Sequence, residues 1–273
     1  MKWPIKWIDA HCHLADPILD ETRAELLKKS ESLGITHWIQ GGVDPDDWTR
    51  QEALKKIWGE QIITCFGLHP WWVVTHSREE LEHAFAELEQ RATHASILGE
   101  MGLDQSRRLP PAHASVSDGF KHQKTAFRYQ LKLASQLGKP VILHIVRAHE
   151  EALQILEKEA ISGFSGLVHS FSGVQAQAKR YIDLGLTISV SGGVAQKGFQ
   201  SMKKAVKVLP KESLVVETDS PDQPLPGLDG LPGALNEPSE LIRVAQAVGE
   251  IRSESYTAVL DQSAANLRRV FKL

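Results

Sequence analysis

Cysteine is scarce in this sequence. The 273 residues contain two cysteines, Cys12 and Cys65, and no Cys-x-x-Cys pair. A disulfide framework or a cysteine-rich structural zinc site needs more cysteines than this. The composition therefore favours a protein of a reducing compartment.

Long hydrophobic runs are also missing. No stretch approaches the roughly 18 consecutive apolar residues that would span a membrane. The N-terminus has no apolar region followed by a cleavage site for secretion. We therefore expect a cytoplasmic monomer without a membrane partner.

There is no excess of basic residues, because 31 Lys and Arg face 34 Asp and Glu, giving a net charge of −3. A protein that coats nucleic acid relies on Lys and Arg to neutralise phosphates, so that class is excluded. An enzyme that holds one nucleic-acid end through metal ions is not excluded.

Short apolar runs that alternate with helical patterns are abundant. Eight runs are expected to be strands, and their continuous apolar character is typical of parallel strands covered by helices. They are Trp7–Leu14, His37–Val43, Ile62–Pro70, Ser96–Asp104, Pro140–Val146, Ser165–Phe171, Leu186–Gly192 and Leu214–Pro221.

Helical stretches follow these runs, and several carry capping signals. Asp44 before Pro45 predicts a helix start, Ser77 with Glu80 forms a capping-box pattern, and Gly138 ends a periodic segment. The expected helices are 21–33, 45–58, 77–91, 121–137, 149–159, 175–184, 198–208, 239–249 and 254–271.

Eight strand–helix repeats predict a single α/β domain over residues 1–273, a (β/α)8 TIM barrel. A doubly wound open sheet is the alternative, but no Gly-x-Gly-x-x-Gly motif follows any strand. Two long loops, 105–119 and 222–238, interrupt the rhythm. Both follow strands, on the face where barrel enzymes place their active sites.

Ionisable residues stand near the ends of five of the expected strands. If Trp7–Leu14 is a strand, His11 and His13 point the same way and Cys12 points the opposite way. An unpaired histidine or carboxylate costs several kcal/mol when buried, so a group of six requires compensating positive charge. We expect two divalent ions to supply it. The six candidate ligands are His11, His13, Glu100, His144, His169 and Asp219.

Several motifs in this sequence resemble those of the TatD family of metal-dependent hydrolases, within the amidohydrolase-like barrels. The resemblance covers essentially the whole chain, in order. The matching segments are His11-Cys12-His13, Gly67-Leu68-His69-Pro70, Gly99-Glu100-Met101-Gly102-Leu103-Asp104, the strand ending in His144, His169-Ser170-Phe171-Ser172-Gly173, Glu217-Thr218-Asp219-Ser220-Pro221, Asn236-Glu237-Pro238 and Asn266 with Phe271.

The resemblance implies a two-metal hydrolase that most often cleaves phosphodiesters in DNA. His11, His13, Glu100 and Asp219 would hold one ion, with Glu100 bridging to a second. His144 and His169 would complete the second site. Asp219 and Glu100 are the expected catalytic residues, and Asp219 would orient the attacking water and take its proton. The ions could be Zn, Mn, Ni or Mg, and the ligand types do not decide between them.

Substrate contacts are expected from His69, Arg147 and Asn236, and the substrate is expected to be a nucleic-acid end or a small phosphodiester. Three positions depart from the family pattern: Arg147 stands one place late after His144, Gln105 replaces a tyrosine, and 231–235 replaces a basic stretch.

The run 222–225 resembles a less characterised branch of the family, the YjjV-like hydrolases. These departures weaken DNA as the substrate. They leave open hydrolysis of an amide, ester or aminoacyl ester at the same metal site.

The other histidines are expected on helices or loops, mostly facing solvent; they are His37, His76, His83, His94, His113, His122 and His149. Trp71 and Trp72 follow His69-Pro70 on a loop of the barrel mouth. They could stack on a base or sugar or pack the loop onto the barrel.

Overall fold

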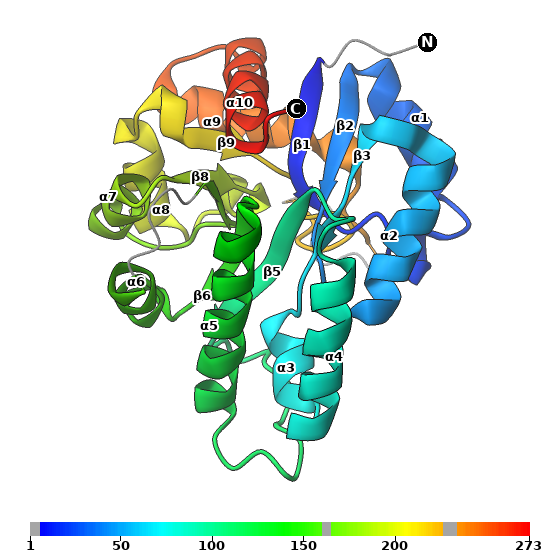
Figure 1. Cartoon of the computed structure of the whole chain (residues 1–273). Helices are drawn as coiled ribbons and strands as arrows, with labels where there is room; N and C mark the ends of the chain where they lie inside the picture. Colours follow the sequence, from blue (N-terminus) through cyan, green and yellow to red (C-terminus); the bar gives the residue numbers. More distant parts are fainter. Residues whose placement is uncertain (1–5, 160–164, 226–233) are drawn as a thin grey trace.

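The chain folds into parallel strands surrounded by helices (Figure 1). The computed structural model describes residues 6–159, 165–225 and 234–273. Every predicted strand contains observed strand residues. The strands are β1 (Trp7–Cys12), β2 (Ile35–Gln40), β3 (Ile62–Ile63), β4 (Cys65–Phe66), β5 (Ile97–Asp104), β6 (Val141–Val146), β7 (Gly166–His169), β8 (Leu186–Val190) and β9 (Leu214–Val216).

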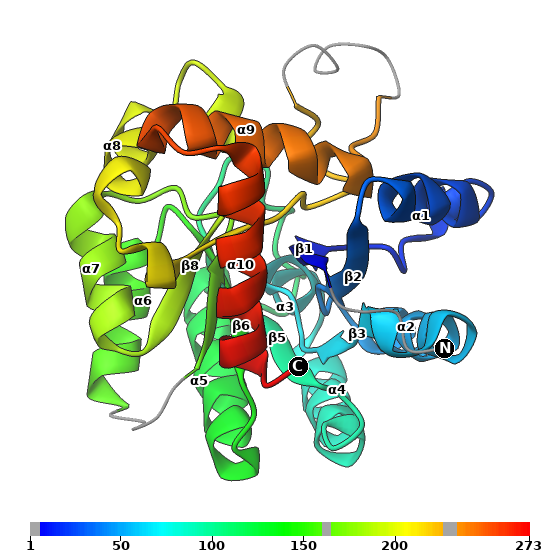
Figure 2. The same cartoon turned by 90° about the horizontal axis from the view of Figure 1, so that it is seen from above.

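The helices cover the outside of the strands, with α1 and α2 on one side of the molecule and α6, α7 and α8 on the other (Figures 1 and 2). Their bounds are α1 (Arg23–Ser32), α2 (Pro45–Trp58), α3 (Pro70–Thr75), α4 (Arg78–Arg91), α5 (Gly119–Leu137), α6 (His149–Lys158), α7 (Gln175–Asp183), α8 (Gln200–Val208), α9 (Leu241–Arg252) and α10 (Tyr256–Phe271). Among the described helices, none combines the length and apolar character needed to cross a membrane.

The predicted helix caps are confirmed. The Asp44 side chain accepts the backbone N–H of Asp47, and Pro45 occupies the first turn of α2. Ser77 and Glu80 form a reciprocal capping box at α4. Gly138 ends α5 in the left-handed conformation that glycine adopts without strain.

The predicted strand Ile62–Pro70 is wrong at its C-terminal end. It divides into β3 and β4, and its last residue begins α3. Pro70 suits the first position of a helix, where no N–H bond is lost. His69 caps this helix through its side chain, which accepts the N–H of Trp71.

The strands form a (β/α)8 barrel. They pair in parallel as a sheet β1-β2-β3 and a sheet β4-β5-β6-β7-β8-β9. Only Thr64 separates β3 from β4. On the other side, the segment after β9 bonds to β1: Asp219 N donates to His11 O at 2.9 Å and His13 N to Ser220 O at 2.7 Å.

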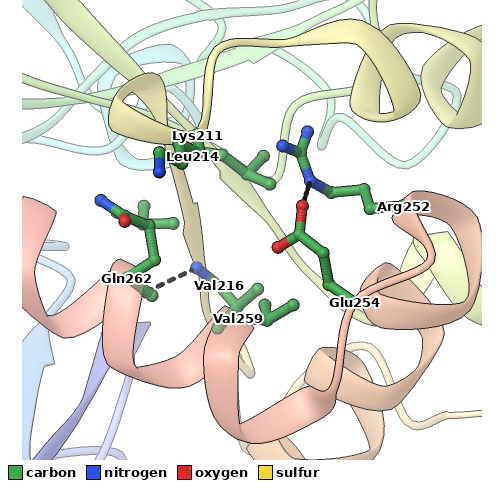
Figure 3. A pocket seen from close by; sticks show the side chains of 9 residues that line it. Lys211, Leu214, Val216, Arg252, Glu254, Val259 and Gln262 are labelled. Carbon is green, nitrogen blue, oxygen red and sulfur yellow. Dashed lines mark hydrogen bonds and ion pairs between the residues drawn. The ribbon is translucent and has the colours of Figure 1, made fainter.

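The barrel interior is apolar at the N-terminal ends of the strands. Helix α10 lies across this end (Figure 2), and its apolar side chains pack against those of the interior. The interior cluster is Ile8, Ala10, Ile39, Ile63, Cys65, Ile97, Ile142, Leu167 and Val215, together with Ala264, Leu267, Val270 and Phe271 of α10. A cavity of about 10 Å³ beside β9, α9 and α10 (Figure 3) has room for no more than about one water molecule.

Candidate metal centre

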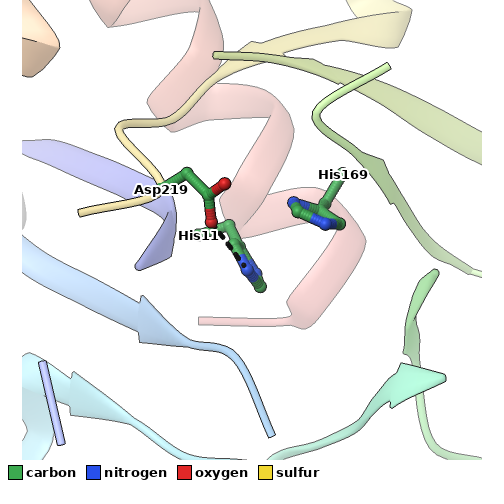
Figure 4. A group of neighbouring side chains, drawn as sticks. All are labelled: His11, His169 and Asp219. Carbon is green, nitrogen blue, oxygen red and sulfur yellow. Dashed lines mark ion pairs between the residues drawn. The ribbon is translucent and has the colours of Figure 1, made fainter. Parts of the chain in front are cut away.

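The six predicted ligands come together at the C-terminal ends of five strands. His11 and His13 come from β1 and the residue after its end, Glu100 from β5, His144 from β6, His169 from the end of β7, and Asp219 from the segment after β9. Figure 4 shows how His11 and His169, from two strands, and Asp219, from the segment after β9, face one another.

Two of these strands contain an irregularity that turns the ligands inward. Between Asp9 and Cys12, β1 runs three residues against two of β2, and β5 does the same against β6 between Leu98 and Met101. A bulge of this kind re-aims side chains. It allows Ile8 and His11 to face the interior although they are an odd number of residues apart.

One group of ligands surrounds one carboxylate oxygen of Glu100. Glu100 Oε2 lies 3.3 Å from His11 Nε2 and 3.5 Å from His13 Nε2. Asp219 Oδ1 lies 3.5 Å from both ring nitrogens, which are themselves 3.2 Å apart. We call His11, His13, Asp219 and this oxygen the first half of the centre.

A second group surrounds the other oxygen of Glu100. Oε1 lies 2.7 Å from His144 Nδ1 and 2.7 Å from His169 Nε2. His69 Nε2 lies 3.7 Å from it. We call His144, His169 and this oxygen, with His69 beside them, the second half of the centre.

Electrostatics favour positive charge between the carboxylates. Burial opposes ionisation of Glu100, but His169 and His11 outweigh it and hold its pKa well below the usual range. Burial likewise opposes protonation of His13, yet Asp219 and Glu100 raise its pKa to about 9. Glu100 and other carboxylates also raise the pKa of His144 and His169 against the effect of burial, so the space between the carboxylates favours positive charge.

The residues fit divalent metal ions. Glu100 Oε2 is buried without a hydrogen-bond partner among the described residues, and a bound cation would satisfy it. Ligands about 2.0–2.1 Å from a tetrahedral ion lie about 3.3 Å apart, close to the 3.2–3.5 Å separations of the first half. Imidazole and carboxylate ligands suit several divalent metals.

His69 is oriented to donate rather than to bind an ion. Its Nδ1 accepts the backbone N–H of Trp71 at 3.1 Å. Burial, reinforced by His144, lowers the pKa of His69 to about 3, so the ring is neutral. A neutral ring that accepts at Nδ1 carries its proton on Nε2, and this nitrogen faces the centre. His69, Glu100 and His144 are close enough to share an ion, but a protonated Nε2 has no lone pair to offer it.

Asp219 is ionised and held from behind. Burial favours its neutral form, but His13, His169 and His11 lower its pKa below the usual range. Gln223 Nε2 donates to Asp219 Oδ2, while the amide oxygen of Gln223 accepts from Ser191 Oγ at 3.0 Å. Ser170, Asp219 and Gln223 all have positive φ angles, which non-glycine residues adopt mainly where function or packing requires it.

The other two predicted contact residues are placed differently. Arg147 is exposed directly after β6, in the left-handed conformation at φ 55°. Asn236 is buried, and its Nδ2 donates to Thr218 O at 2.7 Å while its Oδ1 accepts from Glu237 N. These bonds brace the loop behind Asp219, so a substrate contact of either residue stays a prediction. Most of the departing stretch 231–235 lies outside the described residues.

Three residues whose side chains contact the ligands were assigned no role from the sequence. Asp104 Oδ2 lies 3.1 Å from His144 Nε2, Glu217 Oε1 lies 3.4 Å from His169 Nδ1, and Gln223 holds Asp219. Asp104 and Glu217 each stand in a quoted motif beside a ligand, which was the available signal. Gln223 stands in the quoted run 222–225, but its partners come from three separate strand ends, so the run alone did not indicate this contact.

The solvent-facing placement expected for two of the remaining histidines is wrong. His37 is buried in β2, opposite Ile8. His149 is buried at the start of α6, where its Nδ1 lies 3.2 Å from Tyr181 Oη. A buried histidine needs only one such polar partner and apolar neighbours, so neither position indicates a ligand.

Comparisons with known proteins identify relatives along the whole chain. A family model described as TatD related DNase matches residues 8–272. The metal-dependent hydrolase YjjV of Escherichia coli strain K12, whose name calls it uncharacterised, is 30% identical over 268 residues, 98% of each chain. A 3'-5' ssDNA/RNA exonuclease, TatD of Erwinia amylovora, is 26% identical over 97% of this chain and 99% of its own.

Solved structures agree with these relationships. The crystal structure of Escherichia coli YjjV superimposes with a TM-score of 0.84 at 30% identity, covering 98% of this chain and 99% of that one. A TatD family hydrolase of Entamoeba histolytica reaches 0.79 at 19% identity over 98% and 99%, which shows a shared fold.

Proposed function

Since this chain belongs to the TatD-related DNase family of metal-dependent hydrolases, we propose that it hydrolyses phosphodiester bonds at a two-ion centre. The substrate is a nucleic-acid end, as the name of the 3'-5' ssDNA/RNA exonuclease relative suggests. One observation carries the two-ion assignment. The two oxygens of Glu100 face separate sets of ring nitrogens, at 3.3 and 3.5 Å on one side and at 2.7 Å on the other.

In this proposal His11, His13 and Asp219 hold one ion, His144 and His169 hold the second, and Glu100 bridges them. Bound divalent ions would lower the pKa of a coordinated water and neutralise charge on a phosphoryl group. The chain itself contributes the base. Asp219 is ionised, and Gln223 occupies its Oδ2, which leaves Oδ1 facing the centre to orient the water and take its proton.

His69 supplies a hydrogen-bond donor to the substrate in this scheme. Its Nε2 carries the proton and lies 3.2 Å from His144 Nδ1 and 3.7 Å from Glu100 Oε1, in the second half of the centre. A fixed donor stabilises a phosphoryl oxygen as negative charge develops on it. Arg147, exposed at the end of β6, adds a charge that can contact a phosphate farther along the strand.

The test uses metal-loaded protein with single-stranded DNA and RNA labelled at the 3' or 5' end. Mg, Mn, Zn, Co and Ni are supplied separately. We expect shortening from one end, lost in Asp219→Asn and retained in Asp183→Asn, whose exposed carboxylate pairs with Lys179 on α7. Absence of cleavage with every ion, beside an active family member, would overturn the phosphodiesterase assignment.

A second candidate is hydrolysis of an amide, ester or aminoacyl ester by the same centre. The mouth is acidic beside the base: burial raises the pKa of Asp222, and the nearby Asp219 and Asp16 raise it further. Additional carboxylates repel a polyanion. Turnover of carbonyl substrates without any cleavage of DNA or RNA would favour this candidate.

A further inference from the structure

His144 contacts carboxylates through both of its ring nitrogens. Nδ1 faces Glu100 Oε1 at 2.7 Å, and Nε2 lies 3.1 Å from Asp104 Oδ2 on the far side of the ring. A metal-binding histidine commonly donates its other N–H to a carboxylate, which fixes the tautomer and the ring orientation. In a neutral His144 that donates to Asp104, the lone pair of Nδ1 faces the centre.

Asp104 is held so firmly that it can serve as a fixed acceptor. It is buried at the end of β5, and its Oδ1 accepts the N–H of Ser106 at 2.6 Å. Gln123 of α5 clamps its backbone, accepting from Asp104 N at 2.8 Å and donating to Asp104 O at 3.1 Å. The carboxylate therefore has little freedom to follow a misplaced histidine.

Trp71 connects this pair to the surface. Its indole Nε1 donates to Asp104 Oδ2 at 2.7 Å, the same oxygen that faces His144. Its backbone N–H donates to His69 Nδ1 at 3.1 Å. Trp71 lies in the first turn of α3 and is partly exposed, so one surface residue contacts His69 directly and His144 through Asp104.

We propose that Asp104 and Trp71 are positioning residues for the second half of the centre. Asp104 selects the tautomer of His144 that presents Nδ1 to an ion, and Trp71 fixes Asp104 Oδ2 and the tautomer of His69. The inference rests on the proposed two-ion centre. It predicts that affinity for one ion depends on α3, while affinity for the ion at His11 and His13 does not.

The experiment measures binding of Mn²⁺ or Zn²⁺ to metal-stripped protein by titration calorimetry, without turnover. We expect Asp104→Asn to weaken one of two ions by about 10- to 100-fold, the usual effect of losing such a partner. Trp71→Phe keeps the ring but loses the indole N–H, and we expect a smaller loss at the same ion. Trp72→Phe is the matched control, because Trp72 stacks on His76 instead. This variant should bind both ions as tightly as the wild-type protein.

Long-range ¹H–¹⁵N NMR of the histidine rings provides a readout independent of ion binding. The His144 signals should show a proton on Nε2 in the unchanged protein, and Asp104→Asn should change that tautomer population. If both ions bind but neither their affinities nor the tautomer change in Asp104→Asn, the inference is overturned. If the unchanged protein binds fewer than two ions, the two-ion centre itself fails.

Discussion

The two halves of the centre are built by strands of different kinds. The first half and the shared Glu100 come mainly from β1 and β5, both of which carry a register irregularity beside the ligand. The second half comes from β6 and β7, which pair residue for residue up to His144 and His169. On regular strands, interior apolar residues and ligands follow a strict alternation of two.

The halves also differ in what holds their ligands. In the second half, Asp104 and Glu217 lie behind His144 and His169. His169 Nδ1 nevertheless has no hydrogen-bond partner among the described residues, and neither has His11 Nδ1 in the first half. Backbone bonds from Asp219 N to His11 O and from His13 N to Ser220 O support that side instead. Carboxylates therefore stand behind both histidines of the second half, whereas the first half is held by these backbone bonds and by the Gln223 side chain on Asp219.

The sharpest test of a shared centre is Glu100→Gln. An amide keeps the shape of the side chain but removes the negative charge between the two halves. We expect both ions to be lost together. The transition state would then lose several kcal/mol of stabilisation, which corresponds to a fall in kcat/KM of roughly 10³-fold. Metal analysis after dialysis checks this, with circular dichroism as the control for folding. Retention of two ions would show that Glu100 does not bridge the halves.

The sequence predicted the residues of both halves, but simple strand alternation accounts for the inward direction of the ligands only in the regular half. The placement of His144 and His169 follows directly from alternation along an apolar strand. The inward turn of His11, His13 and Glu100 together with Ile8 and Ile97 requires bulges, which depend on pairing with β2 and β6. The sequence of one strand does not contain that information.

In the fold, too, features that depend on local spacing were predictable and features that depend on distant partners were not. Barrel class, helix caps and strand positions were predictable because they depend on local spacing and on Pro, Gly and Ser at helix ends. The start of α3 within a predicted strand depends on His69 capping it, and the role of Gln223 depends on contacts to Ser170 and Ser191. Both arise from partners or conformations that no local pattern specifies.

Gly99 tests whether the irregular strand needs its glycine. Its φ is 146°, and a Cβ atom there would lie 2.3 Å from Ile142 O in β6. We expect Gly99→Ala to lower the free energy of unfolding by about 3 kcal/mol or more, because backbone atoms must move. Urea unfolding measures this.

Gly138 is the matched control for Gly99. It also has a positive φ, but no atom lies within 4 Å of the position of an added Cβ. Gly138→Ala should therefore cost only about 1 kcal/mol, the conformational penalty alone. Equal losses for the two variants would mean that the close approach of β5 to β6 is not what requires glycine at position 99.

A pair of ligand variants separates the halves. His13→Gln and His144→Gln each remove one ring nitrogen from one half, and we expect each to lower kcat/KM by about 10²-fold. Each should retain one ion per chain, because the other half keeps its ligands and its oxygen of Glu100. Mass-spectrometric metal counting decides this. Loss of both ions in either variant would show that the halves do not bind independently.

His149 provides the contrast of a buried histidine without a carboxylate. Burial alone lowers its pKa to about 4, whereas carboxylates raise the pKa of His13 to about 9. Because the pKa of His149 in the folded state lies below its usual 6.5, its contribution to stability is complete above pH 6.5. That contribution is lost as the pH falls towards 4. Between pH 7 and pH 5 this amounts to about 1–2 kcal/mol.

The substitution His149→Gln isolates this effect. The variant lacks the titrating ring, so its free energy of unfolding should fall less between pH 7 and pH 5 than that of the unchanged protein. Urea unfolding at each pH gives the difference. His83→Gln is the control, because His83 is exposed on α4 and should leave the pH dependence unchanged. If His149→Gln and the unchanged protein lose stability in parallel, burial of a neutral ring is not the source of the acid sensitivity. The protonated ring would then be accommodated in the folded state, with Tyr181 as the hydroxyl partner already in place.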